Sequence, residues 1–391
     1  MLAEKEIHEL VDRRSSLDRL TDYFKSVGYS LENVADLVDA PEPYELVTNG
    51  ARSAVLYGHD LDADRGALAV LARLFLFGAS VSRRSYKATL PADIQELLDD
   101  CGLVVAADSD LMESRVAVTE IQSRYLMSDR LFVNRDGDTE ILSSRYSVWP
   151  PGEWTLVLRD RMARQPDWDK FLDVGCGAGC LALLAHDRYS RVVGIDLNPR
   201  AVAFATLNAA MNGVTNASFM LADYRQVDDV GRHDHVVFAA PSGPEFDPEV
   251  DGGSFVDLDP DESSLIAYGG PLGHELILDF LGAHAPALTT AQGCCQVWAI
   301  FAVRETDGSL EQLVQRAVPD SYQVDVDPLR HGGLYVGAEA ITDGALSWDC
   351  HYARVPDQPR FLRALRRYGI RELVPAIVTV GEGMRAVRGQ R

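Results

Sequence analysis

A glycine-rich segment between an apolar run and a helix-like run is the strongest chemical signal in the sequence. The apolar residues 171–174 precede Gly175, Gly177 and Gly179, and a helix-like run starts at Cys180. Glycines let the backbone adopt positive φ and pass close to a ligand, and open α/β sheets bind ligands at the carboxyl ends of their strands. The G-x-G-x-G spacing matches neither the dinucleotide fingerprint G-x-G-x-x-G nor a P-loop. The alternative is a turn that needs glycine only for tight packing.

Acidic residues follow the next two predicted strands at positions suited to a nucleoside. Asp196 ends the second strand, ahead of Pro199, which is a favourable first residue for a helix. A carboxylate there can accept hydrogen bonds from both ribose hydroxyls. Asp223 ends the third strand, where it can accept from an adenine amino group, and Tyr224 can pack beside the base. The alternatives are a helix N-cap for Asp196 and a turn residue for Asp223.

These motifs lie in a region where strand-like and helix-like segments alternate. Such alternation favours a doubly wound, mostly parallel sheet with helices on both faces. We therefore predict an α/β, Rossmann-like domain over residues 145–391 and a smaller, mainly helical domain with a strand-rich bridge over residues 1–144. The predicted strands of the larger domain are 171–174, 191–195, 217–221, 235–239 and 296–303, and its helices are 154–162, 180–186, 200–211, 273–284 and an amphipathic basic helix near 360–371.

The ordered set of strand-end features resembles the class I S-adenosylmethionine-dependent methyltransferases. It is most similar to the branch of the release-factor glutamine methyltransferases and the small-domain rRNA guanine methyltransferases. The resemblance covers about residues 145–303 and includes the glycine-rich turn at 268–273. It implies that S-adenosylmethionine is the cofactor and methyl transfer the reaction. The cofactor-binding residues it implies are Asp173, Gly175, Cys176, Gly177, Gly179, Asp196, Leu197, Asn198, Asp223, Tyr224 and Ala240.

The loop after the fourth strand departs from that branch. The branch usually carries Asn-Pro-Pro followed by Tyr or Phe, whereas this chain has Ala240, Pro241, Ser242 and Gly243. An alanine cannot hydrogen-bond a substrate nitrogen, and a glycine cannot stack on a planar substrate. The departure favours methylation of an oxygen or an accessible amine on a small molecule. The alternative is that the loop is only a structural turn.

Two groups of residues are candidates for the acceptor side of the site. Pro241 and Ser242 follow the fourth strand, and Tyr146 and Trp149 precede the first predicted helix of the larger domain, in a stretch that the resemblance places over the cofactor. The alternative for the two aromatic residues is a core contact between the domains.

A hydroxyl acceptor needs a general base within hydrogen-bond reach, whereas a carboxylate needs none. His274, at a predicted helix start, and His331, in a loop, are the candidate catalytic bases, with a structural role as the alternative for each. We expect His233 and His235 to be structural and predict no metal site, because zinc needs three or four converging ligands.

The composition of the chain limits the classes of partner that it can bind. The chain has 391 residues and a net charge of -22, which disfavours nucleic acid and anionic membranes. It has no apolar run of the roughly 20 residues that a membrane span needs. Six cysteines in a chain of this length do not form a disulfide framework, so we interpret them as reduced thiols, as is typical of the cytosol. We therefore predict a cytoplasmic biosynthetic methyltransferase with a small-molecule substrate, whose N-terminal domain caps the substrate or forms a homodimer. The alternatives are an rRNA or protein methyltransferase and a non-catalytic S-adenosylmethionine-binding protein.

Overall fold

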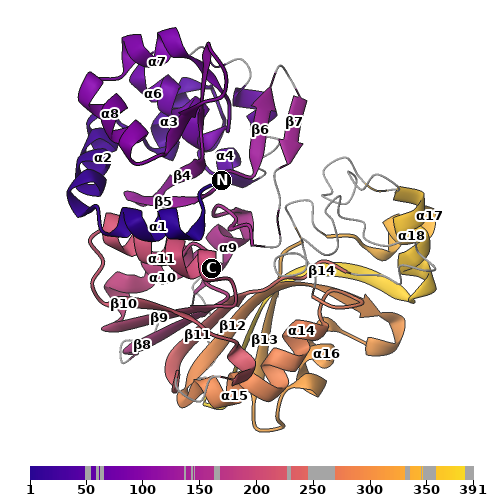
Figure 1. The fold of residues 1–391 in the computed structure, drawn as a ribbon. Coiled ribbons are helices and arrows are strands. Elements are labelled where there is room, and N and C mark those ends of the chain that lie inside the picture. The colour runs from indigo at the N-terminus through magenta and orange to yellow at the C-terminus, as the bar shows by residue number, and fades with distance from the viewer. Residues whose placement is uncertain are drawn as a thin grey trace. The chain divides into compact units, whose positions relative to one another are not determined.

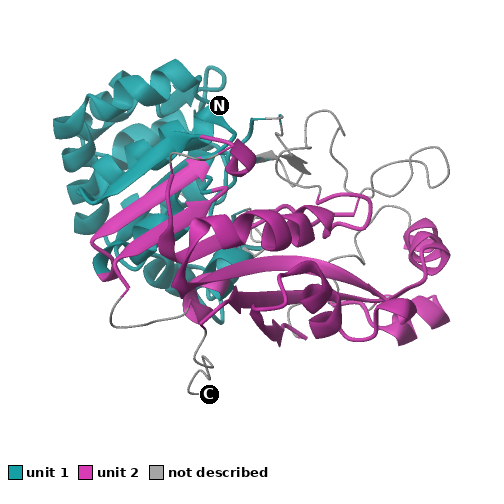
Figure 2. Ribbon diagram, turned by 90° about the horizontal axis from the view of Figure 1, so that it is seen from below, with its two compact units in different colours: residues 1–157, 176–187, 196–221 teal, residues 158–175, 188–195, 222–391 magenta. Residues whose placement is uncertain are grey.

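The computed structural model consists of two compact units (Figures 1 and 2). The two units interleave along the chain. Unit 1 comprises residues 1–157, 176–187 and 196–221, and unit 2 comprises residues 158–175, 188–195 and 222–391. Within these ranges the structure describes residues 1–48, 54–58, 61, 66–135, 138–141, 144, 146–162, 168–226, 230–244, 269–330, 335–344, 346 and 358–383.

A seven-stranded sheet is the framework of the predicted α/β region. Its strands lie in the order β10-β9-β8-β11-β12-β14-β13. Strands β8, β9, β11 and β12 pair in parallel, and β14 pairs antiparallel with β12 and β13. The first five strands thus follow the 3-2-1-4-5 order of doubly wound sheets, and the predicted fold class is confirmed. The bounds are β8 (Lys170–Val174), β9 (Arg191–Asp196), β10 (Ala217–Leu221), β11 (His233–Ala239), β12 (Thr289–Arg304), β13 (Gln323–Pro328) and β14 (Ile370–Gly381).

Helices of unit 2 cover one face of its strands with a buried apolar cluster (Figure 1). Ile277 and Val314, on two of these helices, pack in this cluster with Val236 of β11 and Val297 of β12. The helices of this unit are α14 (Glu275–Asp279), α15 (Ala285–Leu288), α16 (Leu310–Ala317), α17 (Ala338–Asp343) and α18 (Gln358–Arg367). Helix α18 buries Phe361, Leu362, Ala364 and Leu365, so the predicted amphipathic helix is confirmed.

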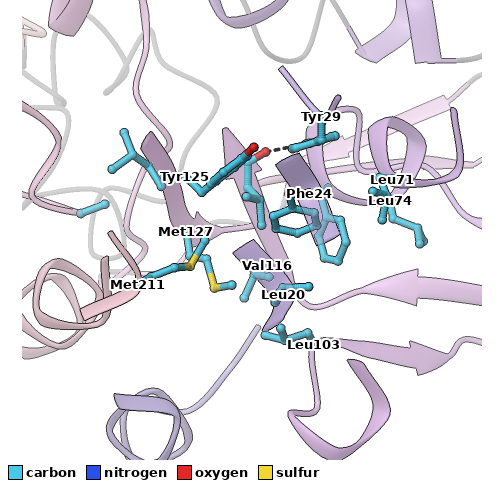
Figure 3. Close-up of a cluster of buried hydrophobic side chains, with 14 of the residues drawn as sticks. Leu20, Phe24, Tyr29, Leu71, Leu74, Leu103, Val116, Tyr125, Met127 and Met211 are labelled. Carbon is cyan, nitrogen blue, oxygen red and sulfur yellow. Dashed lines mark hydrogen bonds between the residues drawn. The ribbon is translucent and has the colours of Figure 1, made fainter. Parts of the chain in front are cut away.

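Unit 1 has its own core, built from the N-terminal helices and short strands (Figure 3). Leu20 and Phe24 of α2 are buried with Tyr125 of β5 and Met211 of α11. The Tyr29 hydroxyl donates a hydrogen bond of 2.7 Å to a buried backbone carbonyl of β4. The helices are α1 (Glu4–Val11), α2 (Arg14–Ser26), α3 (Leu31–Leu37), α4 (Glu45–Thr48), α6 (Ala67–Leu71), α7 (Arg83–Thr89), α8 (Ala92–Asp100), α9 (Glu153–Arg161), which continues into unit 2, α10 (Cys180–Ala185) and α11 (Pro199–Met211).

The strands of the N-terminal region form small antiparallel sheets. They are β1 (Val81–Ser82), β2 (Val104–Ala106), β3 (Leu111–Ser114), β4 (Val116–Ile121), β5 (Arg124–Asp129), β6 (Phe132–Arg135) and β7 (Asp138–Ile141). Strands β6 and β7 pair antiparallel. In the described part of the chain, no helix has the length and apolar character needed to cross a bilayer.

Candidate functional site

The glycine-rich loop connects β8 to α10, as predicted, and three of its residues have positive φ. The φ angles are 62° at Gly175, 53° at Gly177 and 78° at Gly179. A Cβ at Gly179 would lie 2.9 Å from the Ala205 side chain and 3.1 Å from the Phe219 ring, so that glycine is needed for packing. A Cβ at Gly177 would meet no atom within 4 Å. Gly177 therefore leaves open space beside the backbone, where a ligand can approach.

Asp196, the last residue of β9, is hydrogen-bonded to the backbone of this loop. One of its carboxylate oxygens accepts a hydrogen bond from the Gly177 amide at 2.8 Å, and the other accepts from the Asn198 amide at 2.8 Å. Burial raises the pKa of Asp196, and hydrogen bonds from the backbone amides of Asn198, Gly177 and Leu197 oppose that shift. The two oxygens of a carboxylate offer about four acceptor sites. A ligand hydroxyl that donates to the Asp196 carboxylate would therefore compensate further for its desolvation.

The segment that carries Tyr146 and Trp149 is hydrogen-bonded to the start of α11 within unit 1. The Asn198 side chain caps that helix by accepting from the Arg200 amide, and its Nδ2 donates to the Tyr146 carbonyl at 3.0 Å. Arg200 also donates to the Tyr146 carbonyl, and it forms an ion pair with the fully buried Asp129. Asp129 in turn accepts from the Val148 amide at 2.9 Å. These bonds fix the backbone of the segment beside the end of β9.

The predicted aromatic and apolar side chains in unit 1 differ in exposure. Leu197 is 44% exposed and Tyr146 is 43% exposed, so part of each side chain is open to solvent. The Trp149 ring lies 6.3 Å from the Trp154 ring, and its indole N–H is buried with no acceptor among the described residues. Leu221, at the end of β10, is 61% exposed and is a further apolar side chain at this end of the sheet, which no sequence motif indicated.

In unit 2, the parallel register places the predicted strand-end residues at one edge of the sheet. Val174 of β8 pairs with Ile195 of β9 and with Phe238 of β11. The residues after these partners, among them Gly175 and Ala240, therefore follow the carboxyl ends of neighbouring strands. The Asp173 side chain is buried within β8.

Asp223 and Tyr224 have different environments. Asp223 accepts a hydrogen bond from the Arg225 amide at 2.9 Å, which is a turn contact. The Tyr224 ring is only 7% exposed and packs against Phe238 and Phe280 at 5.7 and 5.1 Å. This packing argues against the predicted role of Tyr224 beside a base, because its faces are covered by the core of unit 2.

The loop after β11 packs backbone to backbone against the second glycine-rich turn. A Cβ at Gly269 would lie 2.6 Å from the Pro241 carbonyl oxygen, and a Cβ at Gly273 would lie 2.5 Å from that of Ser242. The Gly269 amide donates to the Gly243 carbonyl at 3.1 Å. Ala240 is buried. The two segments form one compact turn. Glycine is required at 269 and 273 because carbonyl oxygens occupy the space that a Cβ would need.

His274 occupies a buried position behind this turn. Its Nδ1 accepts a hydrogen bond from the Ala302 amide at 3.0 Å, its ring stacks on Phe301, and burial lowers its pKa. The neutral ring therefore carries its proton on Nε2, and its lone pair is already used. This contact argues against a general-base role and favours a structural one. His331 lies outside the described residues.

The other two histidines of interest make separate contacts. His235 is fully buried between Tyr189 and Gln296, and His233 Nδ1 lies 3.2 Å from the Gly231 carbonyl oxygen. Among the residues that the structure describes, no group of three or more His, Cys, Asp or Glu side chains is arranged to hold a metal ion.

These features fit a nucleoside with a flexible tail. Gly177 leaves room for a ligand along the loop, and the Asp196 carboxylate beside it can accept a further hydrogen bond from a ligand hydroxyl. Leu197 presents an exposed apolar surface next to that carboxylate. S-adenosylmethionine carries the matching ribose diol and planar base.

Comparison with known proteins agrees with this chemistry. Residues 167–241 match a family model described as a methyltransferase domain. The chain is 30% identical over 83 residues to a methionine S-methyltransferase of Zea mays, covering 20% of this chain and 8% of that protein. It is 25% identical over 139 residues to an uncharacterized RNA methyltransferase of Oceanobacillus iheyensis, covering 34% and 30% of the two chains.

Two further matches are to a curated protein and to a solved structure. The chain is 31% identical over 103 residues to a protein of Methanocaldococcus jannaschii provisionally named as a protein N5-glutamine methyltransferase, covering 26% of this chain and 51% of that one. The structure of a ribosomal protein L11 methylase from Lactobacillus delbrueckii aligns with 17% identity and a TM-score of 0.31, over 57% and 76% of the two chains.

The matches to the curated relatives are partial. The matched stretch spans 8%, 30% and 51% of the lengths of the three curated relatives. The family model, at residues 167–241, includes β8, the glycine loop, Asp196 and Asp223. This part of the chain is therefore similar to a methyltransferase domain.

Proposed function

We propose that the protein transfers the methyl group of S-adenosylmethionine to a small-molecule acceptor. The observation that carries the proposal is the pairing of Gly177, which leaves open space, with Asp196, which is half-buried and accepts hydrogen bonds from the Gly177 and Asn198 amides. When bound, S-adenosylmethionine supplies a sulfonium methyl group for in-line displacement. Alignment of the acceptor supplies much of the rate in such a step. The chain's own contribution is thus to orient the cofactor through Asp196 and the loop.

The loop after β11 indicates the class of methyl acceptor. Ala240 offers only a buried methyl group where the resembled branch carries an amide side chain. Its neighbours Pro241 and Ser242 are held by the turn at Gly269–Gly273, which favours a fixed, small acceptor site. The net charge of -22 opposes an RNA substrate. A cytoplasmic, biosynthetic role belongs to this proposal, and the free thiols of Cys101, Cys176, Cys180, Cys294 and Cys295 fit a reducing compartment.

A second candidate is an RNA or protein methyltransferase. It is favoured by the names of two relatives, an RNA methyltransferase and a protein N5-glutamine methyltransferase. The first candidate accounts better for Ala240, because an alanine cannot hold an amide or base nitrogen.

The chemistry at the acceptor depends on its nucleophile. Since the lone pair of His274 Nδ1 is used by a backbone amide, we do not assign it as the base. A carboxylate acceptor would need no base, and an amine would need only to be deprotonated. For a hydroxyl acceptor, His331 remains the proposed base.

Cofactor binding can be tested with two matched glycine variants. Gly177 and Gly213 both have positive φ, 53° and 65°, and a Cβ at either position would meet no atom within 4 Å. Alanine at either site therefore introduces similar backbone strain, of order 1 kcal/mol or more. We expect Gly177→Ala to weaken calorimetric binding of S-adenosylhomocysteine by about tenfold or more, whereas Gly213→Ala leaves it within about twofold. Equal affinity in the two variants would refute the placement of the cofactor.

The acceptor class can be tested by methyl transfer. Labelled S-adenosylmethionine and the protein are added to a lysate of the source organism, which is then separated into small-molecule, protein and RNA fractions. Label in the small-molecule fraction supports the proposal. Label in protein or RNA overturns it in favour of the second candidate. No label, with S-adenosylhomocysteine still bound, supports a non-catalytic binding protein.

A further inference from the structure

The side chains of two asparagines on α11 each form a pair of hydrogen bonds with the backbone of β5. Asn208 accepts from the Met127 amide at 2.8 Å and donates to the Met127 carbonyl at 2.8 Å. One turn later, Asn212 accepts from the Tyr125 amide at 2.9 Å and donates to the Tyr125 carbonyl at 2.8 Å. Residues 125 and 127 present their amides on the same edge of a strand, and residues 208 and 212 lie on the same face of a helix. The two side chains therefore form a short ladder that fixes α11 to the N-terminal region.

The two asparagines differ in one hydrogen bond. The second Nδ2 proton of Asn208 is donated to the Ala178 carbonyl in the glycine loop, at 2.9 Å. The second Nδ2 proton of Asn212 returns to the Asn208 carbonyl of its own helix, at 2.8 Å. Asn208 is fully buried, and all three of these hydrogen bonds lie within unit 1. Of these two asparagines, Asn208 is the one that connects β5 to the cofactor loop.

Ala178 lies between two residues of the loop that have positive φ. Gly177 is held through its amide by Asp196, and Ala178 is held through its carbonyl by Asn208. The amide and the carbonyl of successive residues are thus anchored from two different elements. Because each flanking glycine has access to more conformations than other residues, removing one anchor would let the loop sample geometries that no longer fit a ligand.

We propose that Asn208 is a positioning residue that couples the packing of β5 to the shape of the cofactor loop and so sets cofactor affinity. The inference rests on the proposed function, because it takes S-adenosylmethionine as the ligand of that loop. It assigns the N-terminal region a role in cofactor binding that needs no direct contact with the cofactor.

Asn212 provides the matched control for this proposal. Asn208→Ala and Asn212→Ala each remove a strand-pairing amide from the same helix, and only the first removes the loop contact. We expect Asn208→Ala to weaken calorimetric binding of S-adenosylhomocysteine by roughly five- to tenfold, which corresponds to one hydrogen bond. Asn212→Ala should stay within about twofold, although both variants lower the unfolding temperature. Equal weakening by both variants would overturn the inference alone.

A measurement on the wild-type chain covers the case in which Asn208→Ala does not fold. Coupling is reciprocal, so a ligand on the loop must also stabilise the far end of the Asn208 contact. Saturating S-adenosylhomocysteine should slow hydrogen exchange of the Met127 amide at least about threefold more than that of the Tyr125 amide. Equal slowing of the two amides would contradict the coupling. Absence of any binding by the wild-type chain would instead overturn the proposed function and this inference together.

Discussion

His235 makes the stability of the protein depend on pH through a buried polar chain. Its Nε2 lies 2.9 Å from the Gln296 side-chain oxygen, and its Nδ1 lies 2.7 Å from the Tyr189 hydroxyl. Because that amide oxygen can only accept, Nε2 carries the proton and Nδ1 accepts from the tyrosine. Gln296 continues the chain by donating to the Thr379 hydroxyl at 3.0 Å. The fully buried ring therefore has its neutral form satisfied on both sides.

Burial lowers the pKa of His235 to about 3, from its ordinary value of 6.5. The unfolded chain takes up a proton as the pH falls through 6.5, whereas the folded chain takes it up only near pH 3. The free energy of unfolding is therefore fully retained above pH 6.5 and is lost progressively as the pH falls from 6.5 toward 3. Between pH 7 and pH 5 the loss from this one group is about 2 kcal/mol.

The test compares variants, because burial also lowers the pKa of His233, to about 4. Urea unfolding is followed by tryptophan fluorescence at pH 7 and pH 5, using the Trp168 ring, which packs 5.1 Å from His235. We expect His235→Gln to reduce the loss between the two pH values by about 2 kcal/mol relative to the wild type. Thr379→Val is the control: it breaks the same polar chain and leaves the titrating group in place, so its loss should match that of the wild type. If His235→Gln loses as much stability as the wild type, the buried histidine is not the titrating group.

Two further substitutions test the packing of unit 1. Gly179→Ala places a Cβ 2.9 Å from Ala205 and 3.1 Å from Phe219 at a φ of 78°, so we expect a loss of about 2–4 kcal/mol in urea unfolding; a loss below about 1 kcal/mol would show that the helix can shift to accommodate the methyl group. Tyr29→Phe removes the donor to the buried Val118 carbonyl, and we expect it to lower the free energy of unfolding by about 1–2 kcal/mol. An unchanged urea midpoint in that variant would mean that the hydrogen bond adds nothing to stability.

The local order of elements around the site could be predicted from the sequence. The predicted strand at 171–174 is β8 (Lys170–Val174), and the predicted helices at 180–186 and 200–211 begin within one residue of α10 and α11. These elements depend on apolar runs, glycine positions and caps, which are signals between near neighbours in the chain. Strands β13 and β14 were not predicted. The two strands pair with each other in the sheet, and no local pattern had singled out either segment.

The roles of individual residues at the site were decided by the tertiary structure. The sequence alone predicted that the three loop glycines and Asp196 would act together, but it treated those glycines as equivalent. Only the fold distinguishes Gly177, which leaves open space, from Gly179, which packs against a side chain 40 residues away. The fold also covers Tyr224 with the core and uses the lone pair of His274 Nδ1 in a backbone contact. Asn208 carried no local signal, because its two partner residues, Ala178 and Met127, lie 30 and 81 residues away in the chain, and only folding brings them within hydrogen-bond distance.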